Sequence, residues 1–307
     1  MRYGLPYKGG KNSIAEWLVQ QLPSADTFVD LFFGGGAITH SALLSGKYKH
    51  FIANDIDGRL IPFFLDCCYG KYTVENHPEW ISREEFFERK DDDAYIALVW
   101  SFGNNGKDYL YSKEREPFKK AMHYACFFDD LSLFEELGIK IPRSNKKGTY
   151  ERYLEYKKHF EDQDSMRNNE IERLQNLENI TRLQSLQSLQ SDYQSVVIPD
   201  GSLIYADPPY SDTNCGKYQG FDSQRFYEWA RKQDNIFISE YSMPDDFIPY
   251  AWIEKQVLSA ASTNAITAKE IIYTNQRTWE KLTERQKEIS KQNFAEQITL
   301  EEFICEV

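Results

Sequence analysis

The chain has 307 residues, and its 48 acidic side chains against 36 basic ones give a formal net charge of -12. This length provides for one large domain or two moderate ones, each with a buried core. Such a negative charge argues against nucleic-acid binding through overall electrostatics, because a basic surface is the usual footprint of phosphate recognition. Any polyanionic partner must therefore meet a local basic region of the chain.

No run approaches the roughly 18 consecutive apolar residues that indicate a membrane span, and the first ten residues lack the apolar core of a signal peptide. The five cysteines have neither the number nor the spacing of a disulfide framework or a CxxC zinc site. We therefore expect reduced thiols, a cytoplasmic location, no membrane and no metal ion.

Helix and strand signals alternate over the first 70 residues in the order typical of a parallel α/β sheet. The pattern predicts an amphipathic helix over residues 13–22, a buried strand over 27–33, a helix over 37–45 and a second strand over 51–56. From about residue 71 the strand signals give way to charged helical stretches such as 83–89 and 150–160. We interpret this part as an inserted, mainly helical module.

The α/β pattern returns near residue 201. It predicts a strand over 201–206, a helix over 223–232, a strand over 235–239 and strand-rich stretches over 253–258 and 270–274. The resulting domain prediction is a sheet domain from residues 1–72 and 190–275, an inserted domain from 73–189 and a helical C-terminal extension from 276–307.

Between Ile171 and Leu189 an apolar residue recurs at every third position, and this stretch ends in three Leu-Gln-Ser tripeptides. A period of three drifts around a helix of 3.6 residues per turn, so a straight helix cannot keep these residues on one face. We expect a helix that rolls across its neighbour or breaks near Thr181, with a short solenoid-like or interaction stretch as the alternative. Either way the segment is interpreted as a connector.

The strongest chemical motif is Asp207-Pro208-Pro209-Tyr210, directly after an apolar strand. An acid at the carboxyl end of a parallel strand stands where α/β sheets bind ligands. Two successive prolines remove two backbone donors, so the Asp207 carboxylate and the Pro208 carbonyl are offered as acceptors beside an aromatic ring. This combination suits a planar group that carries an NH2; the alternative is a proline-stiffened turn with an incidental acid.

A second motif runs from the strand that contains Asp30 through Phe32 and Phe33 into three glycines at 34–36. A strand, a glycine loop and a helix in this order let the backbone approach a nucleotide closely. Asp55 closes the next strand 25 residues after Asp30, where an acid binds ribose hydroxyls in nucleotide-binding βαβ units. A third motif, Tyr7-Lys8-Gly9-Gly10-Lys11, precedes the first helix and could otherwise be a flexible turn.

Together and in this order, the three motifs resemble the D12 class of DNA adenine-N6 methyltransferases, which includes the GATC-type adenine methylases of bacteria and phages. The resemblance covers residues 7 to about 275. It implies an α/β, Rossmann-like methyltransferase sheet with an inserted target-recognition domain at 73–189. It also implies S-adenosyl-L-methionine (AdoMet) as methyl donor, adenine in double-stranded DNA as acceptor, and a bacterial or phage-infected cell.

The same resemblance assigns roles to individual residues. Asp207, Pro208, Pro209 and Tyr210 become catalytic, with Asp207 and the Pro208 carbonyl holding the hydrogens of the adenine N6 amine and Tyr210 stacking on a base flipped out of the duplex. Cofactor binding falls to Tyr7, Lys11, Asp30, Phe32, Gly34, Gly35, Gly36, Asp55 and Asp207. Tyr7 stands where many relatives have tryptophan, and Gly36 and Phe33 vary within the family.

DNA contact is expected in two basic parts of the insertion. Residues 140–158 contain 7 basic and 2 acidic side chains with tyrosines 150, 153 and 156 interleaved, which suits phosphate contact with stacking, or else a solvated helix face. The turn-rich stretch 101–120 resembles a DNA-facing loop of the family. The expected DNA-binding residues are Asn104, Asn105, Lys107, Lys113, Arg115, Arg143, Lys146 and Lys147.

Several alternatives stay open at this point. N4-cytosine methylation uses the same geometry but more often has serine in place of Asp207, and C5-cytosine methylation is disfavoured because no cysteine follows a proline. RNA or protein-amide methylation and a non-catalytic AdoMet or nucleic-acid-binding module are further alternatives. The enzyme could be an orphan or phage methylase or half of a restriction system, and we expect a monomer or weak dimer.

Overall fold

The computed structural model describes residues 3–160, 169–180, 186–209, 220–258, 265–288 and 290–291, and for residues 255–258 and 265–268 it describes the backbone alone. These residues form two compact units. The sheet unit comprises the described residues of Ser13–Phe33, Ile38–Asp57 and Ser185–Val307, and the helical unit those of Met1–Asn12, Gly34–Ala37 and Gly58–Gln184.

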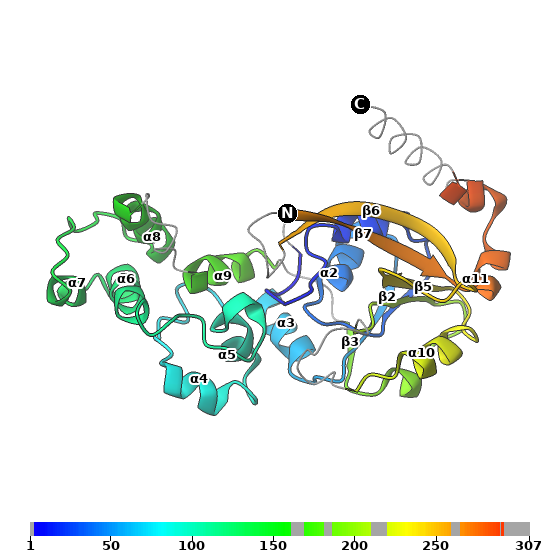
Figure 1. Cartoon of the computed structure of the whole chain (residues 1–307), viewed down its shortest axis with the longest axis horizontal. Coiled ribbons are helices and arrows are strands. Elements are labelled where there is room, and N and C mark those ends of the chain that lie inside the picture. The colour runs from blue at the N-terminus through cyan, green and yellow to red at the C-terminus, as the bar shows by residue number, and fades with distance from the viewer. Residues whose placement is uncertain are drawn as a thin grey trace. The chain divides into compact units, whose positions relative to one another are not determined.

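In the sheet unit, seven strands of the described chain form one sheet in the order β3-β2-β1-β4-β5-β7-β6. The strands are β1 (Thr27–Asp30), β2 (His50–Asn54), β3 (Gln187–Leu189), β4 (Leu203–Ala206), β5 (Ile236–Glu240), β6 (Ile248–Leu258) and β7 (Ala265–Thr274). Strands β3, β2, β1, β4 and β5 are parallel, whereas β7 runs antiparallel to β5 and β6 antiparallel to β7. Figure 1 shows β6 and β7 as two long strands that lie side by side.

The central strands are short apolar runs that are covered on both faces. Every residue of β4 and β5 is buried, as are three of the four residues of β1. This explains why their sequences are continuously apolar and do not alternate. Val29, Ile204 and Ile238 share a core with Phe226 and Ala230 of helix α10 (Ser223–Ala230).

The other helices that flank the strands in the sequence are α1 (Ala15–Gln21), α2 (Ala37–Ser45) and α11 (Gln276–Lys281). Polar side chains satisfy their exposed ends, as helix termini require. Lys47 Nζ donates to the Val19 carbonyl near the end of α1 at 2.8 Å, Asp222 caps α10 and Asn275 caps α11. These caps fix where each helix starts or stops.

The helical unit contains α3 (Leu60–Cys68), α4 (Arg83–Arg89), α5 (Ala94–Val99), α6 (Glu116–Phe128), α7 (Ser132–Glu136), α8 (Thr149–Lys157) and α9 (Asn169–Glu178). Two 3-10 turns, Phe102–Asn104 and Lys158–Phe160, join them. Met122, Tyr153, Tyr156 and Ile171 pack in one core between α6, α8 and α9. Figure 1 shows α4 to α9 in cyan and green. The predicted helices 83–89 and 150–160 are therefore confirmed.

The segment with a period of three divides into two elements. Ile171, Leu174 and Leu177 are buried on α9, which ends at Glu178, so the predicted break is confirmed. The Leu-Gln-Ser end forms β3, an edge strand parallel to β2, which the periodicity did not predict. The physical reason is that β2 offers unpaired backbone groups at its outer edge, and pairing overrides the local helical preference. Residues 181–185 lie outside the described residues.

The compact units also differ from the predicted boundaries at residues 72/73 and 189/190. The structure divides the chain at Gly58 and Gln184, because α3 packs with α5 and α9 of the helical unit while β3 pairs within the sheet. In the predicted extension, α11 is followed by a further helical turn in which Lys287 N bonds the Thr283 carbonyl. The functional names of these domains stay predictions.

Candidate active site

Two neighbouring parallel strands, β1 and β4, end in aspartates. β2 and β3, which follow β1 in the chain, lie on one side of β1 in the sheet, whereas β4 and β5 lie on its other side. The strand order therefore reverses between β1 and β4. Asp30 ends β1 opposite Tyr205 of β4, and Asp207 directly follows β4. Open α/β sheets bind ligands outside the strand ends at such a reversal. The two aspartates therefore mark the candidate reaction site.

Asp30 is 1% exposed, and its two carboxylate oxygens differ in their surroundings. Oδ2 accepts a 2.6 Å hydrogen bond from Thr39 Oγ1, whereas Oδ1 is buried without a hydrogen-bond partner among the described residues. Burial raises the pKa of the Asp30 carboxyl to about 7; the Thr39 hydrogen bond lowers it, and the charges of Asp207 and Asp55 raise it further. Because an unpaired buried acceptor is costly, Oδ1 favours a ligand that brings a donor or a positive charge.

Asp207 is partly exposed, in contrast to Asp30, and begins the turn that contains Pro208 and Pro209. Neither proline has an N–H, so the turn presents acceptors and no backbone donor at these two positions. Two residues earlier, Tyr205 Oη donates a 3.0 Å hydrogen bond to Ser239 Oγ of β5, which fixes the end of β4. Tyr210, the fourth residue of the predicted catalytic motif, lies outside the described residues.

Asp55 follows the last residue of β2 and is 1% exposed. Its Oδ1 accepts a 2.9 Å hydrogen bond from the backbone N–H of Asp57, and its own N–H bonds the Leu189 carbonyl at 3.3 Å. The charge of Asp55 contributes to the raised pKa of Asp30. The structure therefore brings both Asp55 and Asp207 within electrostatic reach of Asp30.

The glycine loop packs against the N-terminal segment within the helical unit. Gly34 and Gly36 have φ values of +52° and +71°, a region that favours glycine. Leu5 N donates a 2.7 Å hydrogen bond to the Gly35 carbonyl, and a Cβ on Gly35 would lie 2.6 Å from Tyr7 Cβ. Tyr7 thus already excludes a side chain at Gly35, and the positive φ of Gly34 disfavours one there, whatever ligand the loop also meets.

Two other predicted cofactor residues have clear surroundings. Phe32 is partly buried, and its ring lies 5.5 Å from Tyr193 and 5.7 Å from both Phe221 and Phe226, so it contributes to an aromatic core in the sheet unit. Lys11 is 3% exposed within the helical unit. A lysine this buried is unusual without a structural or binding role.

The predicted DNA-facing loop is held by its own asparagines. Asn104 Nδ2 donates to the Leu98 carbonyl and Asn105 Nδ2 to Asp108, each at 2.8 Å, so both amides are used to shape the turn. Asn104 has φ +56°, a left-handed conformation that such a turn requires. Phe102, two residues before Asn104, is 65% exposed. Lys107, Lys113 and Arg115 are exposed in or just after this loop.

The basic stretch 140–158 divides into engaged and available side chains. Arg143 forms a 2.6 Å ion pair with Asp129, whereas Lys146 and Lys147 are exposed, and among the described residues no side-chain partner is found for either. Tyr153 and Tyr156 are fully buried in the core of the helical unit. The expectation that these two tyrosines stack on bases is therefore wrong: their spacing of three places both on the core face of α8.

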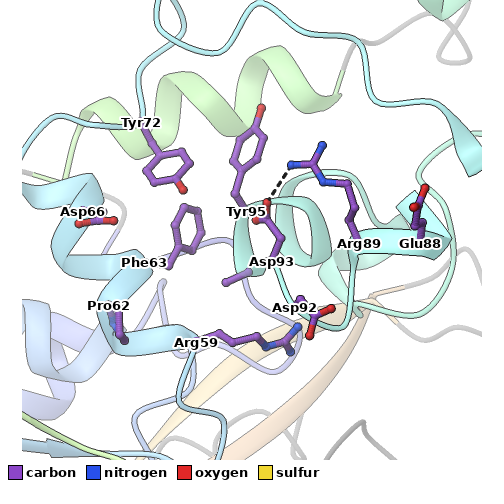
Figure 2. Close-up of a pocket in the computed structure, with 11 residues that line it drawn as sticks. Arg59, Pro62, Phe63, Asp66, Tyr72, Glu88, Arg89, Asp92, Asp93 and Tyr95 are labelled. Atoms are coloured by element: carbon purple, nitrogen blue, oxygen red, sulfur yellow. Dashed lines mark hydrogen bonds and ion pairs between the residues drawn. The ribbon is translucent and has the colours of Figure 1, made fainter. Parts of the chain in front are cut away.

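A cavity of about 560 Å³ lies in the helical unit, away from these lysines in sequence. Figure 2 shows Phe63, Tyr72 and Tyr95 on one side, and the Arg89–Asp93 ion pair on another. The charged residues that line it are Arg59, Asp66, Glu88, Arg89, Asp92 and Asp93. Acids outnumber bases here, so the cavity is unsuited to phosphate.

Sequence reasoning missed three residues of interest. Thr39 hydrogen-bonds Asp30, Asn54 bonds neighbouring strand ends, and Phe102 is a large apolar side chain left exposed. A hydroxyl residue in the first turn of the helix after the glycine loop is a signal that could have indicated Thr39. The sequence around Phe102 does not indicate its exposure, since Trp100 and Tyr109 are aromatic residues of the same stretch and both are buried.

The sheet order, the parallel strands that end in acids and the antiparallel β7 define a Rossmann-like methyltransferase fold. Residues 7–278 match the family model of the D12 class N6 adenine-specific DNA methyltransferase, and the chain belongs to this family. It is thus an adenine-specific DNA methyltransferase, with DNA and a methyl donor as its substrates.

A search of curated proteins found no match to the chain. Across the described ranges, no group of His, Cys, Asp and Glu side chains is arranged to hold a metal ion. Within the same ranges, none of the helices has the length and apolar character needed to cross a membrane.

Proposed function

We propose that this enzyme transfers a methyl group from AdoMet to the N6 amine of an adenine that is flipped out of double-stranded DNA. The observation that carries the proposal is the position of Asp30 at the end of β1 and of Asp207 directly after the adjacent strand β4, where the strand order reverses. One carboxyl is buried and half satisfied, and the other is partly exposed at a turn rich in acceptors. This difference between the two carboxyls is the one expected if Asp30 belongs to the methyl-donor site and Asp207 to the adjacent methyl-acceptor site.

The residues present fit AdoMet. When bound, AdoMet supplies an electrophilic methyl group on a positively charged sulfur. The buried Oδ1 of Asp30 suits the cationic methionine part, because a positive charge or an N–H there satisfies an otherwise unpaired oxygen. Asp55, at the end of the adjacent strand β2, suits the ribose hydroxyls. Tyr7, Lys11, Phe32 and the glycines 34–36 complete the proposed donor site.

On the acceptor side, Asp207 and the Pro208 carbonyl accept hydrogen bonds from the two N6 hydrogens of adenine. This favours a nitrogen lone pair directed at the methyl group and stabilises the positive charge that develops on the amine. No covalent intermediate with the protein is needed, because a positioned amine would take the methyl group directly as the methyl–sulfur bond breaks; S-adenosylhomocysteine would leave and the amine would release one proton. Tyr210 follows in the motif and would stack on the flipped base.

The rival functions are less well supported. N4-cytosine methylation needs the same acceptors, but the family match is to adenine-specific DNA enzymes. The same match disfavours RNA and protein amides as substrates. A non-catalytic module has no need of Asp207 at the strand end. We propose a bacterial or phage-infected cell as its setting, and a monomer or weak dimer as its form.

DNA is expected to meet the helical unit at Lys146 and Lys147 and at the loop that carries Phe102. Both lysines are exposed, and neither side chain forms a hydrogen bond or ion pair with the described residues, whereas Arg143 is paired with Asp129. Phe102 offers an exposed ring on a loop whose turn is fixed by hydrogen bonds. A rigid loop with an exposed aromatic suits insertion into a base stack.

Asp207→Asn and Asp207→Ala test the proposed chemistry. We expect single-turnover methylation of DNA to fall by roughly a hundredfold or more, because Asp207→Ala removes the acceptor and Asp207→Asn removes its negative charge, which stabilises the positive charge that develops on the amine. Both variants should still bind AdoMet, as measured by calorimetry, because Asp30 and Asp55 of the proposed donor site remain. Methylation at the wild-type rate in both variants would remove Asp207 from the mechanism.

A further inference from the structure

The Leu-Gln-Ser repeat ends beside the proposed ribose-binding acid. Its last tripeptide is Leu189-Gln190-Ser191, and Leu189 lies opposite Asn54 in the parallel pairing of β3 with β2. Asp55 follows Asn54 directly. The repeat, which its periodicity alone marks as a connector, is therefore next to the donor site proposed above.

Asn54 binds two neighbouring segments with its side chain. Its Nδ2 donates to the Leu31 carbonyl at 3.1 Å and to the Ser191 carbonyl at 3.0 Å. Its Oδ1 accepts from Ser191 N at 3.1 Å and from Ser191 Oγ at 2.9 Å. The amide is 1% exposed and uses both its hydrogens and its oxygen. Such a fully satisfied buried amide fixes the geometry of its neighbours.

The backbone around Asp55 is held from both sides in the same way. Phe33 N donates a 2.9 Å hydrogen bond to the Asn54 carbonyl, and Asp55 N donates to the Leu189 carbonyl at 3.3 Å. The Asp55 carboxylate is then oriented by the Asp57 N–H. The strand end that carries Asp55 is thus fixed to the segment after β1 and to the segment after β3.

The repeat itself makes this attachment necessary. Registers of β3 that differ by three residues place the same residue types opposite β2, because each tripeptide is identical. Pairing by the repeat alone therefore specifies the register weakly. Two residues beyond Ser191, Tyr193 is 6% exposed and packs on Phe32 and Phe226, and this packing selects the last serine for the bond to Asn54.

We propose that Asn54 and Ser191 are positioning residues that hold Asp55 in place for the ribose of the methyl donor. The inference rests on the proposed role of Asp55. It gives the Leu-Gln-Ser end a function in donor binding through the edge strand. Neither residue contacts the reacting atoms; both act through the strand end that carries the acid.

The test measures binding of S-adenosylhomocysteine and of its 2′- and 3′-deoxyribose analogues to four proteins: wild type, Asp55→Ala, Asn54→Ala and Ser191→Ala. In wild type, removal of the ribose hydroxyl that Asp55 binds should weaken binding roughly tenfold or more, and this loss of affinity is the penalty that the variants are compared on. Asp55→Ala should abolish this penalty. Asn54→Ala should reduce it to about threefold or less and Ser191→Ala should reduce it in part, because a displaced acid discriminates poorly.

Ser188→Ala is the matched control, since Ser188 is the same residue in the preceding tripeptide and is exposed. It should keep the full wild-type penalty. A wild type that binds all three ligands equally would refute the role of Asp55 and the inference with it. A penalty that Asp55→Ala removes but Asn54→Ala and Ser191→Ala retain would overturn the positioning role alone. Should Asn54→Ala not fold, Ser191→Ala against Ser188→Ala decides.

Discussion

Thr39 Oγ1 donates a 2.6 Å hydrogen bond to Asp30 Oδ2, and so joins the helix after the glycine loop to the strand before it. The bond satisfies one oxygen of a buried carboxyl and leaves Oδ1 for a ligand. It also fixes the carboxyl relative to the backbone of α2. The proposed donor site is therefore organised around an acid whose pKa is raised to about 7.

The first prediction concerns pH and Asp30. Its carboxyl holds a proton below about pH 7 and is ionised above, so affinity for the cationic AdoMet should rise about tenfold from pH 6 to pH 8. Calorimetry across this range measures it. S-adenosylhomocysteine lacks the sulfonium charge but carries the same amine and carboxylate, and should show a smaller change.

Asp30→Asn is the matching variant. It keeps the size of the side chain and the hydrogen bond with Thr39 but has no charge to titrate. AdoMet should bind it more weakly, with little pH dependence attributable to the protein. If the variant reproduced the wild-type pH profile, Asp30 would not be the titrating group.

The second prediction concerns DNA affinity. Lys146→Ala with Lys147→Ala should weaken binding to all DNA sequences and reduce the slope of log K against log salt by about 2, one for each phosphate that a lysine no longer neutralises. The matched control replaces Lys49 and Lys71, whose side chains are 74% and 63% exposed and pair with Asp26 and Asp66. It has the same change in charge and should leave the slope unchanged. Equal slopes in both double variants would exclude this basic region.

The third prediction concerns Phe102. If its exposed ring fills the space left by the flipped base, Phe102→Ala should slow methylation of duplex DNA by roughly tenfold. The effect should shrink on DNA that has an abasic site opposite the target adenine, because that base leaves the stack more easily. Phe87→Ala removes a similar ring, 51% exposed on α4, and should be neutral. An equal reduction on both DNAs would contradict the wedge role.

The fourth prediction concerns stability. Glu170 is fully buried with both oxygens lacking a hydrogen-bond partner in the described chain, 3.6 Å from His123 Nδ1. Burial raises its pKa to about 8, although Arg173 lowers it, whereas unfolding returns the pKa to its ordinary value of 4.5. Between pH 4.5 and about 8 the folded protein binds more protons at Glu170 than the unfolded protein does. The contribution of Glu170 to the free energy of unfolding therefore falls as pH rises.

Glu170→Gln should therefore become more stable relative to wild type as pH rises from 5 to 8, at a limit of about 1.4 kcal/mol for each pH unit. Denaturant unfolding at several pH values measures the difference. Burial lowers the pKa of His123 to about 4, so His123 makes the free energy of unfolding rise with pH between 4 and 6.5. This effect is the same in wild type and variant and cancels in their difference. A pH-independent difference would show that Glu170 is already ionised in the folded protein.

Much of the sheet could be predicted because its strands are continuous apolar runs bounded by acids and glycines. Each of these runs ends in an acid, namely Asp30, Asp55 or Asp207. Because the strands are parallel, their carboxyl ends lie at the same end of the sheet, and the sequence therefore predicts that the three acids lie there together. The α/β class and the family are confirmed. The helix of residues 37–45 has the predicted bounds because Gly46, with φ +69°, ends it.

The features that the sequence did not predict depend on interactions between distant residues. Ser191 becomes part of a strand end because Asn54, 137 residues earlier, offers matching hydrogen-bond groups. Tyr153 and Tyr156 look like surface aromatics in a basic stretch, yet α6 and α9 bury both. The raised pKa of Asp30 likewise arises from burial and neighbouring acids that only the folded chain assembles.

The central claim is methyl transfer to adenine N6, with Asp207 as an acceptor for the amine. The most direct measurement incubates the enzyme with AdoMet and double-stranded DNA, digests the DNA to nucleosides and quantifies each methylated base by mass spectrometry. We predict N6-methyladenine from wild type and an initial rate of its formation that is lower by roughly a hundredfold or more for Asp207→Ala, which should still bind AdoMet. N4-methylcytosine without N6-methyladenine, or undiminished methylation by the variant, would contradict the account.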